Sequence, residues 1–246
     1  MQTIAVVNAL LDRRGVDAAI VPLHVTAEDF AATVAGMRHL RNFDGYAVSI
    51  PHKPMAARLC DELLPNAPAC GVVNVIRVDP DGRWIGETLD GMGMVKAITA
   101  QRVLDVNTRV LVVGAGGVGR AIAVALALEG VGYLAVANRT RAKAVDLAET
   151  VRRAAPTCIA EAGSAFDPAA FDIVINATSL GLNGQGPLPI DVSRVSETAL
   201  VAEVVMSPKL TPLLQAAQTR GLEIVYGREM LTLQLEAGAD FLGMTV

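Results

Sequence analysis

The stretch VLVVGAGGVGRAIAVAL, residues 110–126, decides the fold of this chain. An apolar run leads into glycines that fit the pattern G-x-G-x-x-G, at Gly114, Gly116 and Gly119, and an amphipathic helical pattern follows them. The first glycine permits a tight turn, the second lets the backbone approach a pyrophosphate, and the third lets the helix pack closely on the strand. Free amide donors at the start of the helix suit phosphate groups. This context predicts a Rossmann dinucleotide-binding unit over residues 109–139.

The end of the second strand of this unit indicates which dinucleotide binds. An NAD-binding unit usually carries Asp or Glu there, to hold the ribose 2′-hydroxyl. This chain instead has Asn138-Arg139-Thr140, beginning 19 residues after Gly119. Arg139 offers a planar fork of donors to a 2′-phosphate, and Thr140 and Lys143 can add contacts. The alternative is an ordinary solvated arginine, but the missing carboxylate favours NADP(H).

Strands and helices are predicted to alternate along nearly the whole chain. The expected helices are 5–13, 26–39, 54–64, 91–101, 117–129, 141–153, 211–220 and 230–242, and the expected strands are 18–23, 46–50, 72–78, 84–88, 110–113, 133–138, 173–178, 200–205 and 223–226. This alternation indicates an α/β fold with mainly parallel sheets. A polar stretch at 99–108 separates two such series and places a boundary near residues 95–105.

Composition and charge argue against several classes of protein. The net charge of −4 gives no electrostatic reason to bind nucleic acid. No apolar run approaches the ~20 residues that cross a bilayer, and the first residues lack the pattern of a secretory signal. The three cysteines, Cys60, Cys70 and Cys158, are irregularly spaced, which argues against a disulfide framework or a zinc site. We expect them to be buried free thiols in a reducing cytoplasm. No cluster has metal-ligand spacing, so we expect no metal site.

Lys53 and Asp90 are the candidate catalytic residues. Each follows a predicted strand, where α/β proteins build ligand sites. Brought together, they form a plausible proton-transfer pair in which the carboxylate orients the ammonium. Each also has an ordinary alternative, because Lys53 could be a solvated lysine at a helix start and Asp90 a helix N-cap. His52 ranks below Lys53 because the sequence shows no partner for it.

Together these motifs resemble those of the shikimate dehydrogenase family. The similar segments, in chain order and with the family pattern in parentheses, are 49–53 (N-V-T-I-P-H-K), 71–75 (G-A-V-N-T), 86–93 (G-x-N-T-D-G-x-G), 114–121 (G-A-G-G-x-x-R-A), 138–140 (N-R-T), 175–179 (I-N-A-T-S), 211–214 (T-P-L-L) and 230–234 (M-L-x-x-Q). Each motif alone is modest, but the ordered set is specific.

The resemblance implies reversible hydride transfer between NADPH and a ring carbonyl, as between 3-dehydroshikimate and shikimate in aromatic amino acid biosynthesis. It implies an α/β substrate-binding domain at 1–95 with the C-terminal helix 228–246, and a Rossmann NADP-binding domain at 96–227. Lys53 would be the general acid/base and Asp90 its partner. Substrate hydroxyls would be held by Ser49, Asn74 and Gln234. The residues lining NADP would be Gly114, Ala115, Gly116, Gly117, Val118, Asn138, Arg139, Thr140, Lys143 and Thr178. A homodimer is one assembly that the resemblance allows.

The departures from the family pattern fall in the substrate half. The Asn of N-V-T-I-P-H-K is Ala47, the N-T before the aspartate is Thr88-Leu89, and the Tyr of D-x-x-Y is Met206. The S-x-S motif that binds the substrate carboxylate is not recognisable, with Thr3 the one candidate for its second serine. Losing a group that bonds the substrate relaxes or redirects substrate choice. The substrate alternatives are therefore quinate, an aminated shikimate analogue or another hydroxylated ring acid.

Two further classes stay open at this point. The altered substrate half also fits a non-catalytic NADP-binding or regulatory protein. Another two-domain α/β dehydrogenase, such as one acting on folate, is a weaker reading because no substrate motif for it is found.

Overall fold

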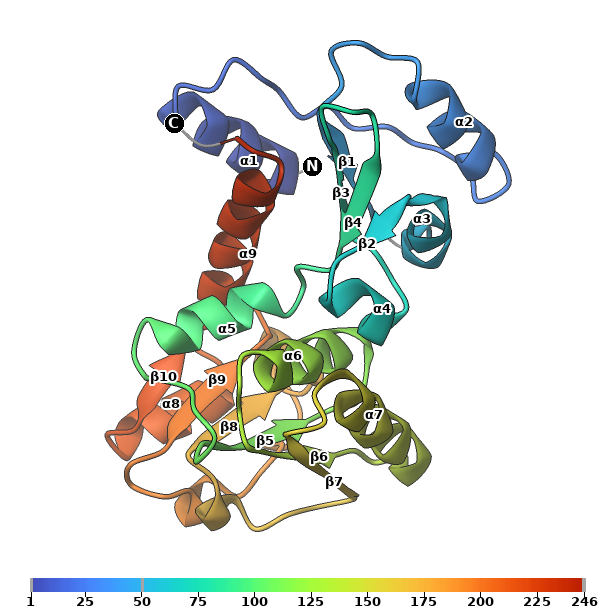
Figure 1. The fold of residues 1–246 in the computed structure, drawn as a ribbon. Helices are drawn as coiled ribbons and strands as arrows, with labels where there is room; N and C mark the ends of the chain where they lie inside the picture. The colour runs from blue at the N-terminus through green and yellow to red at the C-terminus, as the bar shows by residue number, and fades with distance from the viewer. Residues whose placement is uncertain (1, 50, 245–246) are drawn as a thin grey trace. The chain divides into compact units, whose positions relative to one another are not determined.

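The chain divides into two compact units (Figure 1). The computed structural model describes residues 2–49 and 51–244, and side chains from Ile4 onward. The first unit comprises Met1–Leu89 and Leu235–Val246, and the second comprises Asp90–Gln234. Within these described residues, no helix combines the length and apolar character that a bilayer crossing requires.

A six-stranded parallel sheet forms the centre of the second unit, in the order β10-β9-β8-β5-β6-β7. Its strands are β5 (Arg109–Val113), β6 (Tyr133–Ala137), β7 (Ile159–Gly163), β8 (Ile173–Asn176), β9 (Leu200–Glu203) and β10 (Glu223–Val225). The helices are α5 (Met92–Thr99), α6 (Gly117–Leu128), α7 (Arg141–Ala154) and α8 (Pro212–Thr219), with α9 (Gly227–Phe241) running on into the first unit. The predicted α/β class and parallel sheet are confirmed.

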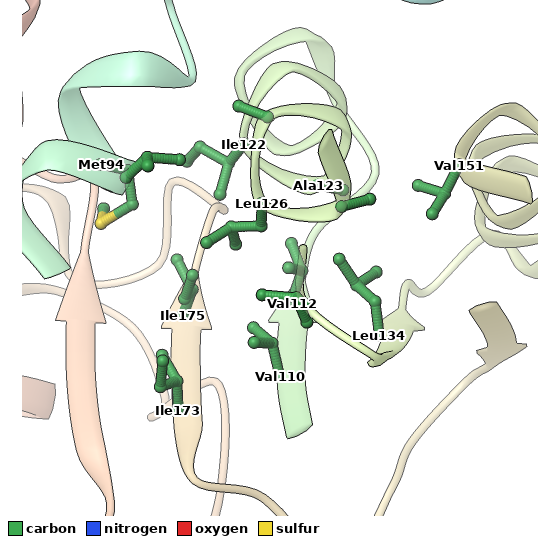
Figure 2. Packing of buried hydrophobic residues seen from close by; sticks show 14 of the residues in the cluster. Met94, Val110, Val112, Ile122, Ala123, Leu126, Leu134, Val151, Ile173 and Ile175 are labelled. Atoms are coloured by element: carbon green, nitrogen blue, oxygen red, sulfur yellow. The ribbon is translucent and has the colours of Figure 1, made fainter. Parts of the chain in front are cut away.

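Both faces of this sheet are covered by helices. Side chains alternate along each strand, so the inner strands β5, β6, β8 and β9 contribute residues to a core on each face. In β5, Val110 and Val112 join a core with α5, α6 and α7, whereas Leu111 joins a second core with α8. Figure 2 shows the first core, in which Ile122 and Leu126 of α6 lie over β5 and β8. The apolar runs of the sequence are thus strands buried on both faces.

The first unit contains a smaller sheet in the order β1-β3-β4-β2. Its strands are β1 (Gly45–Ala47), β2 (Glu62–Leu63), β3 (Val75–Val78) and β4 (Trp84–Glu87), and its helices are α1 (Gln2–Arg13), α2 (Phe30–Met37), α3 (Lys53–Leu59) and α4 (Asn66–Cys70). This sheet is mixed rather than mainly parallel, since β3 pairs antiparallel with both β1 and β4. The turn at 79–82 explains the pairing of β3 with β4, because so short a connection can only join antiparallel neighbours.

Several predicted elements of the first unit differ in the structure. The strand predicted at 18–23 is wrong: this segment is irregular, and the side chains of Val21 and Leu23 are 69% and 63% exposed. The helix predicted at 54–64 ends at Leu59, and β2 follows it. The helix predicted from Thr26 begins only at Phe30, after a turn. The strand predicted at 46–50 ends at Ala47, and Ile50 lies outside the described residues.

Candidate functional site

The glycine loop lies at the point where the strand order of the second unit reverses. From β5 the chain continues through β6 and β7 on one side, while β8, β9 and β10 lie on the other. In open α/β sheets, ligands bind outside the carboxyl ends of the strands at such a point. Gly114 follows β5 and Ala177 follows β8, and a Cβ added to Gly114 would lie 2.7 Å from the Ala177 carbonyl oxygen.

Two glycines of the loop have a demonstrable steric role. Gly114 has a φ of 113°, which side chains rarely allow. A Cβ on Gly119 would lie 2.1 Å from the Gly114 carbonyl oxygen, so glycine is what lets α6 begin so close to the turn. Gly116, Gly117 and Val118 are exposed, and a Cβ on Gly116 or Gly117 would meet nothing within 4 Å. The first turn of α6 therefore presents open backbone with the positive end of a helix dipole.

Asn138 shapes this loop through its side chain. Its Oδ1 accepts a hydrogen bond from the Ala115 backbone N–H at 3.1 Å, and its Nδ2 donates to the Thr140 carbonyl oxygen at 2.9 Å. The amide thus ties the glycine loop to the segment after β6. The sequence alone suggested a direct cofactor contact for Asn138 and gave no sign of this link.

Three cations lie together at the start of α7. Arg139, Arg141 and Lys143 are exposed, and no described carboxylate forms an ion pair with any of them. Arg120 of α6, in contrast, is paired with Asp146. The cluster has the unsatisfied donors and positive charge that a phosphate needs.

The loop after β8 is organised by a buried network that sequence reasoning missed. Thr178 donates its hydroxyl proton to Asn176 Oδ1 at 2.6 Å, and Asn176 Nδ2 donates to the Glu203 carboxylate at 3.0 Å. Asn176, Glu203 and Thr211 are each 0% exposed. Burial raises the pKa of Glu203 above its ordinary value, against the lowering effect of the groups that donate to it. The available signal was the charged residue that ends the apolar strand β9, in the pattern Leu-Val-Ala-Glu.

Backbone hydrogen bonds in the first unit bring Ser49, Lys53 and Asn74 to neighbouring positions. Val48 N–H, beside Ser49, donates to the Asn74 carbonyl oxygen at 2.7 Å. Val73 N–H, beside Asn74, donates to the Lys53 carbonyl oxygen at 3.1 Å. Ser49 is exposed, Lys53 is half-buried at the first residue of α3, and Asn74 is buried.

The Asn74 side chain also contacts Leu89, the last residue of the first unit before the chain enters the second. Its Oδ1 accepts a hydrogen bond from the Leu89 backbone N–H at 2.9 Å, and Leu89 directly precedes Asp90 in the chain. The buried amide therefore fixes the main chain just before the predicted catalytic aspartate.

His52 has a structural role that the sequence did not reveal. Its ring stacks on Phe30, with ring centroids 4.4 Å apart and an angle of 8° between the planes. Its Nε2 lies 3.1 Å from the Val25 carbonyl oxygen. These contacts anchor the turn that begins α3.

In the second unit, Asp90 and Gln234 are joined directly. Gln234 Nε2 donates to Asp90 Oδ1 at 2.9 Å. The close approach of α5 and α9 depends on Gly93, because a Cβ there would lie 2.1 Å from the Met230 carbonyl oxygen. The carboxylate is thus held in one orientation by a side chain predicted to contact substrate.

The positions that depart from the family pattern present few groups to a ligand. Ala47 is exposed and Leu89 is buried. The Thr88 hydroxyl donates to the Val72 carbonyl oxygen, so its proton is used within the unit. Met206 is 46% exposed and places a thioether where the pattern has a phenol. Groups of three or more metal-ligating side chains are not found among residues 2–49 and 51–244.

Comparison with known proteins gives a consistent result. The family model of the shikimate dehydrogenase substrate binding domain matches residues 2–76, and that of shikimate / quinate 5-dehydrogenase matches residues 98–182. A shikimate dehydrogenase (NADP(+)) of Acidiphilium cryptum is 38% identical over 96% of this chain and 83% of its own length.

Two solved structures share the fold. One is the ligand-free 5-ketofructose reductase of a Gluconobacter strain, with a TM-score of 0.91 and 30% identity over 98% of this chain and 87% of that one. The other is shikimate 5-dehydrogenase of Thermus thermophilus with NADP(H) and shikimate, with a TM-score of 0.78 and 27% identity over 98% and 87%. By its family models, its relatives and its fold, this chain belongs to the shikimate dehydrogenase family.

Proposed function

We propose that this protein is an NADP-dependent dehydrogenase that interconverts a ring carbonyl and a ring hydroxyl, with shikimate as the first substrate to test. The cation cluster of Arg139, Arg141 and Lys143, which has no ion pair with a carboxylate of the described residues, carries the proposal. The relative from Acidiphilium cryptum is named for the same cofactor, and the structure from Thermus thermophilus holds NADP(H) and shikimate.

The residues present fit the cofactor. Open backbone at Gly116 and Gly117 leaves room for a pyrophosphate at the start of α6. Arg139, Thr140 and Lys143 would hold the 2′-phosphate, and Thr178 would contact the cofactor from the loop after β8. Bound NADPH supplies the hydride. We assign residues 96–227 to this NADP-binding domain, and 1–95 with 228–246 to the substrate domain.

The chain's own residues would manage the proton. Lys53 would protonate the carbonyl oxygen as hydride reaches the adjacent carbon, and would take the proton back in the reverse direction. Asp90 would orient the ammonium, and Gln234 would keep the carboxylate in place through its hydrogen bond. Ser49 and Asn74 would hold substrate hydroxyls.

A substrate panel tests this function. Purified protein should oxidise shikimate, quinate or an aminated analogue with NADP at a higher kcat/KM than with NAD, followed by NADPH absorbance. Binding of NADPH with no turnover on any of these acids or on the keto sugar considered below would favour the non-catalytic alternative.

A second candidate is reduction of a keto sugar without a carboxylate. The structure of 5-ketofructose reductase and the altered positions Ala47, Leu89 and Met206 favour it. Including 5-ketofructose in the panel separates the two, because turnover on the sugar with none on the ring acids would select this candidate. The homodimer and the cytoplasmic location stay predictions, and light scattering of the purified protein checks the former.

A further inference from the structure

We propose that Glu203 is a positioning residue for NADP(H): through Asn176 it sets the orientation of the Thr178 hydroxyl. The inference rests on the proposed function, because Thr178 is assigned there to the cofactor. Glu203 itself is wholly buried at the end of β9 and lies beside Asn176 in the parallel pairing of β8 with β9.

Every described partner of the Glu203 carboxylate is a hydrogen-bond donor. Asn176 Nδ2 lies 3.0 and 3.2 Å from its two oxygens, Val205 N–H donates at 3.0 Å and the Thr211 hydroxyl donates at 3.1 Å. The Thr211 oxygen accepts from Leu214 N–H at 3.2 Å, which leaves its own proton for Glu203. The pocket is therefore built for a group that only accepts.

An asparagine amide can sit in either of two orientations, and Glu203 selects one. Because the carboxylate accepts, the nitrogen of Asn176 must face it, and the same nitrogen donates to the Leu180 carbonyl oxygen at 3.1 Å. Oδ1 then faces Thr178 and accepts from its backbone N–H at 3.0 Å and its hydroxyl at 2.6 Å.

This arrangement fixes what Thr178 can offer a ligand. Its hydroxyl proton is committed to Asn176, and its oxygen accepts from Leu180 N–H at 3.1 Å. One lone pair remains. Thr178 can therefore accept a hydrogen bond from a donor of the cofactor, such as a ribose hydroxyl or the carboxamide NH2, but cannot donate one.

We call the chain of hydrogen bonds from Glu203 through Asn176 to Thr178 the relay. The substitution Glu203→Gln tests it with almost no change in side-chain shape. The new amide nitrogen must face a donor, so the glutamine or Asn176 has to turn, and Oδ1 of Asn176 no longer has a fixed direction toward Thr178. We expect the Kd of NADPH, measured by fluorescence titration, to rise about tenfold. The kcat at saturating NADPH and the KM of the ring substrate should stay within about threefold.

A double-mutant cycle with Thr178→Val separates relay from general damage. Thr178→Val should also raise the Kd about tenfold, and the double variant should bind no more than about threefold more weakly than either single variant. Glu203→Asp, which keeps the acceptor, should restore binding to within about threefold of the wild type. Glu223→Gln, on the exposed start of β10, is the matched control and should not change the Kd.

The outcomes separate the inference from the function on which it rests. A folded Glu203→Gln variant with wild-type NADPH affinity, or a double variant about a hundredfold weaker than the wild type, would overturn the relay. Wild-type protein that binds no NADPH would overturn the proposed function and the inference with it. If Glu203→Gln does not fold, Glu203→Asp takes its place, with a smaller expected rise in the Kd of NADPH. The relay predicts that this rise disappears when Thr178→Val is also present. A rise of the same size in the Thr178→Val background would contradict the relay.

Discussion

Among the residues assigned to the 2′-phosphate, Arg139 is the one expected to influence cofactor choice most. A guanidinium can bond a 2′-phosphate through two charge-assisted hydrogen bonds, whereas NAD has only a hydroxyl there. We expect Arg139→Ser to raise the KM of NADP about tenfold to a hundredfold and to change that of NAD little. Arg153→Ser, at the other end of α7, is the control. An unchanged ratio of kcat/KM for NADP and NAD in Arg139→Ser would refute the assignment.

The sequence suggested which residues to assign to the proposed cofactor site, but not how they are held. Arg139 could be named because the absence of a carboxylate is visible in the sequence. The bond from Ala115 to Asn138 and the network around Glu203 could not be predicted, since each joins residues from different strand ends. Side-chain networks of this kind become apparent only when the strand order is known.

At the scale of elements, the junction of β5 with α6 contains one glycine with no room for an added methyl group and another with open space around it. A Cβ on Gly119 would overlap the Gly114 carbonyl oxygen, whereas one on Gly117 would meet nothing within 4 Å. We expect Gly119→Ala to lower the free energy of unfolding by about 1–3 kcal/mol. Gly117→Ala should raise it by up to about 1 kcal/mol, because alanine restricts the unfolded chain. Urea unfolding checks both, and equal effects of the two substitutions would contradict this geometry.

Prediction of elements succeeded for most of the second unit, with the exception of β7, and failed in parts of the first. Strands buried on both faces appear as apolar runs, and helices on both faces appear as amphipathic stretches, so the alternation in the second unit was readable. The apolar run at 18–23 looks the same but has no neighbouring strand to pair with in the described structure. The edge strand β7 was missed because Ile-Ala-Glu-Ala-Gly has weak strand propensity.

At the scale of the whole molecule, two buried glutamates should govern part of the pH dependence of stability. Burial raises the pKa of Glu87 in the first unit and of Glu203 in the second. A carboxyl whose folded pKa lies above its ordinary value of 4.5 binds protons more tightly in the folded state. Its contribution is therefore most favourable below pH 4.5 and decreases as the pH rises through the folded pKa.

We expect the unfolding free energy of the wild type, measured relative to Glu87→Gln, to fall as the pH rises from about 4 and then to level off. Because the two glutamates lie in separate units, Glu203→Gln should give its own fall, and the two should add in the double variant. Urea unfolding across this pH range checks the sign. A difference that stays flat or rises with pH would contradict the direction of the pKa shifts.

Lys53 provides the most direct test of the central claim, which is that this chain carries out NADP-linked proton and hydride chemistry. The measurement compares kcat with the best substrate of the panel and the Kd of NADPH for wild type, Lys53→Ala and Lys53→Arg. Arginine keeps the positive charge but does not give up its proton at working pH. Both variants should therefore lose about a hundredfold to ten-thousandfold in kcat while binding NADPH within about twofold of the wild type. Substantial turnover in Lys53→Ala, or full activity in Lys53→Arg, would contradict the account.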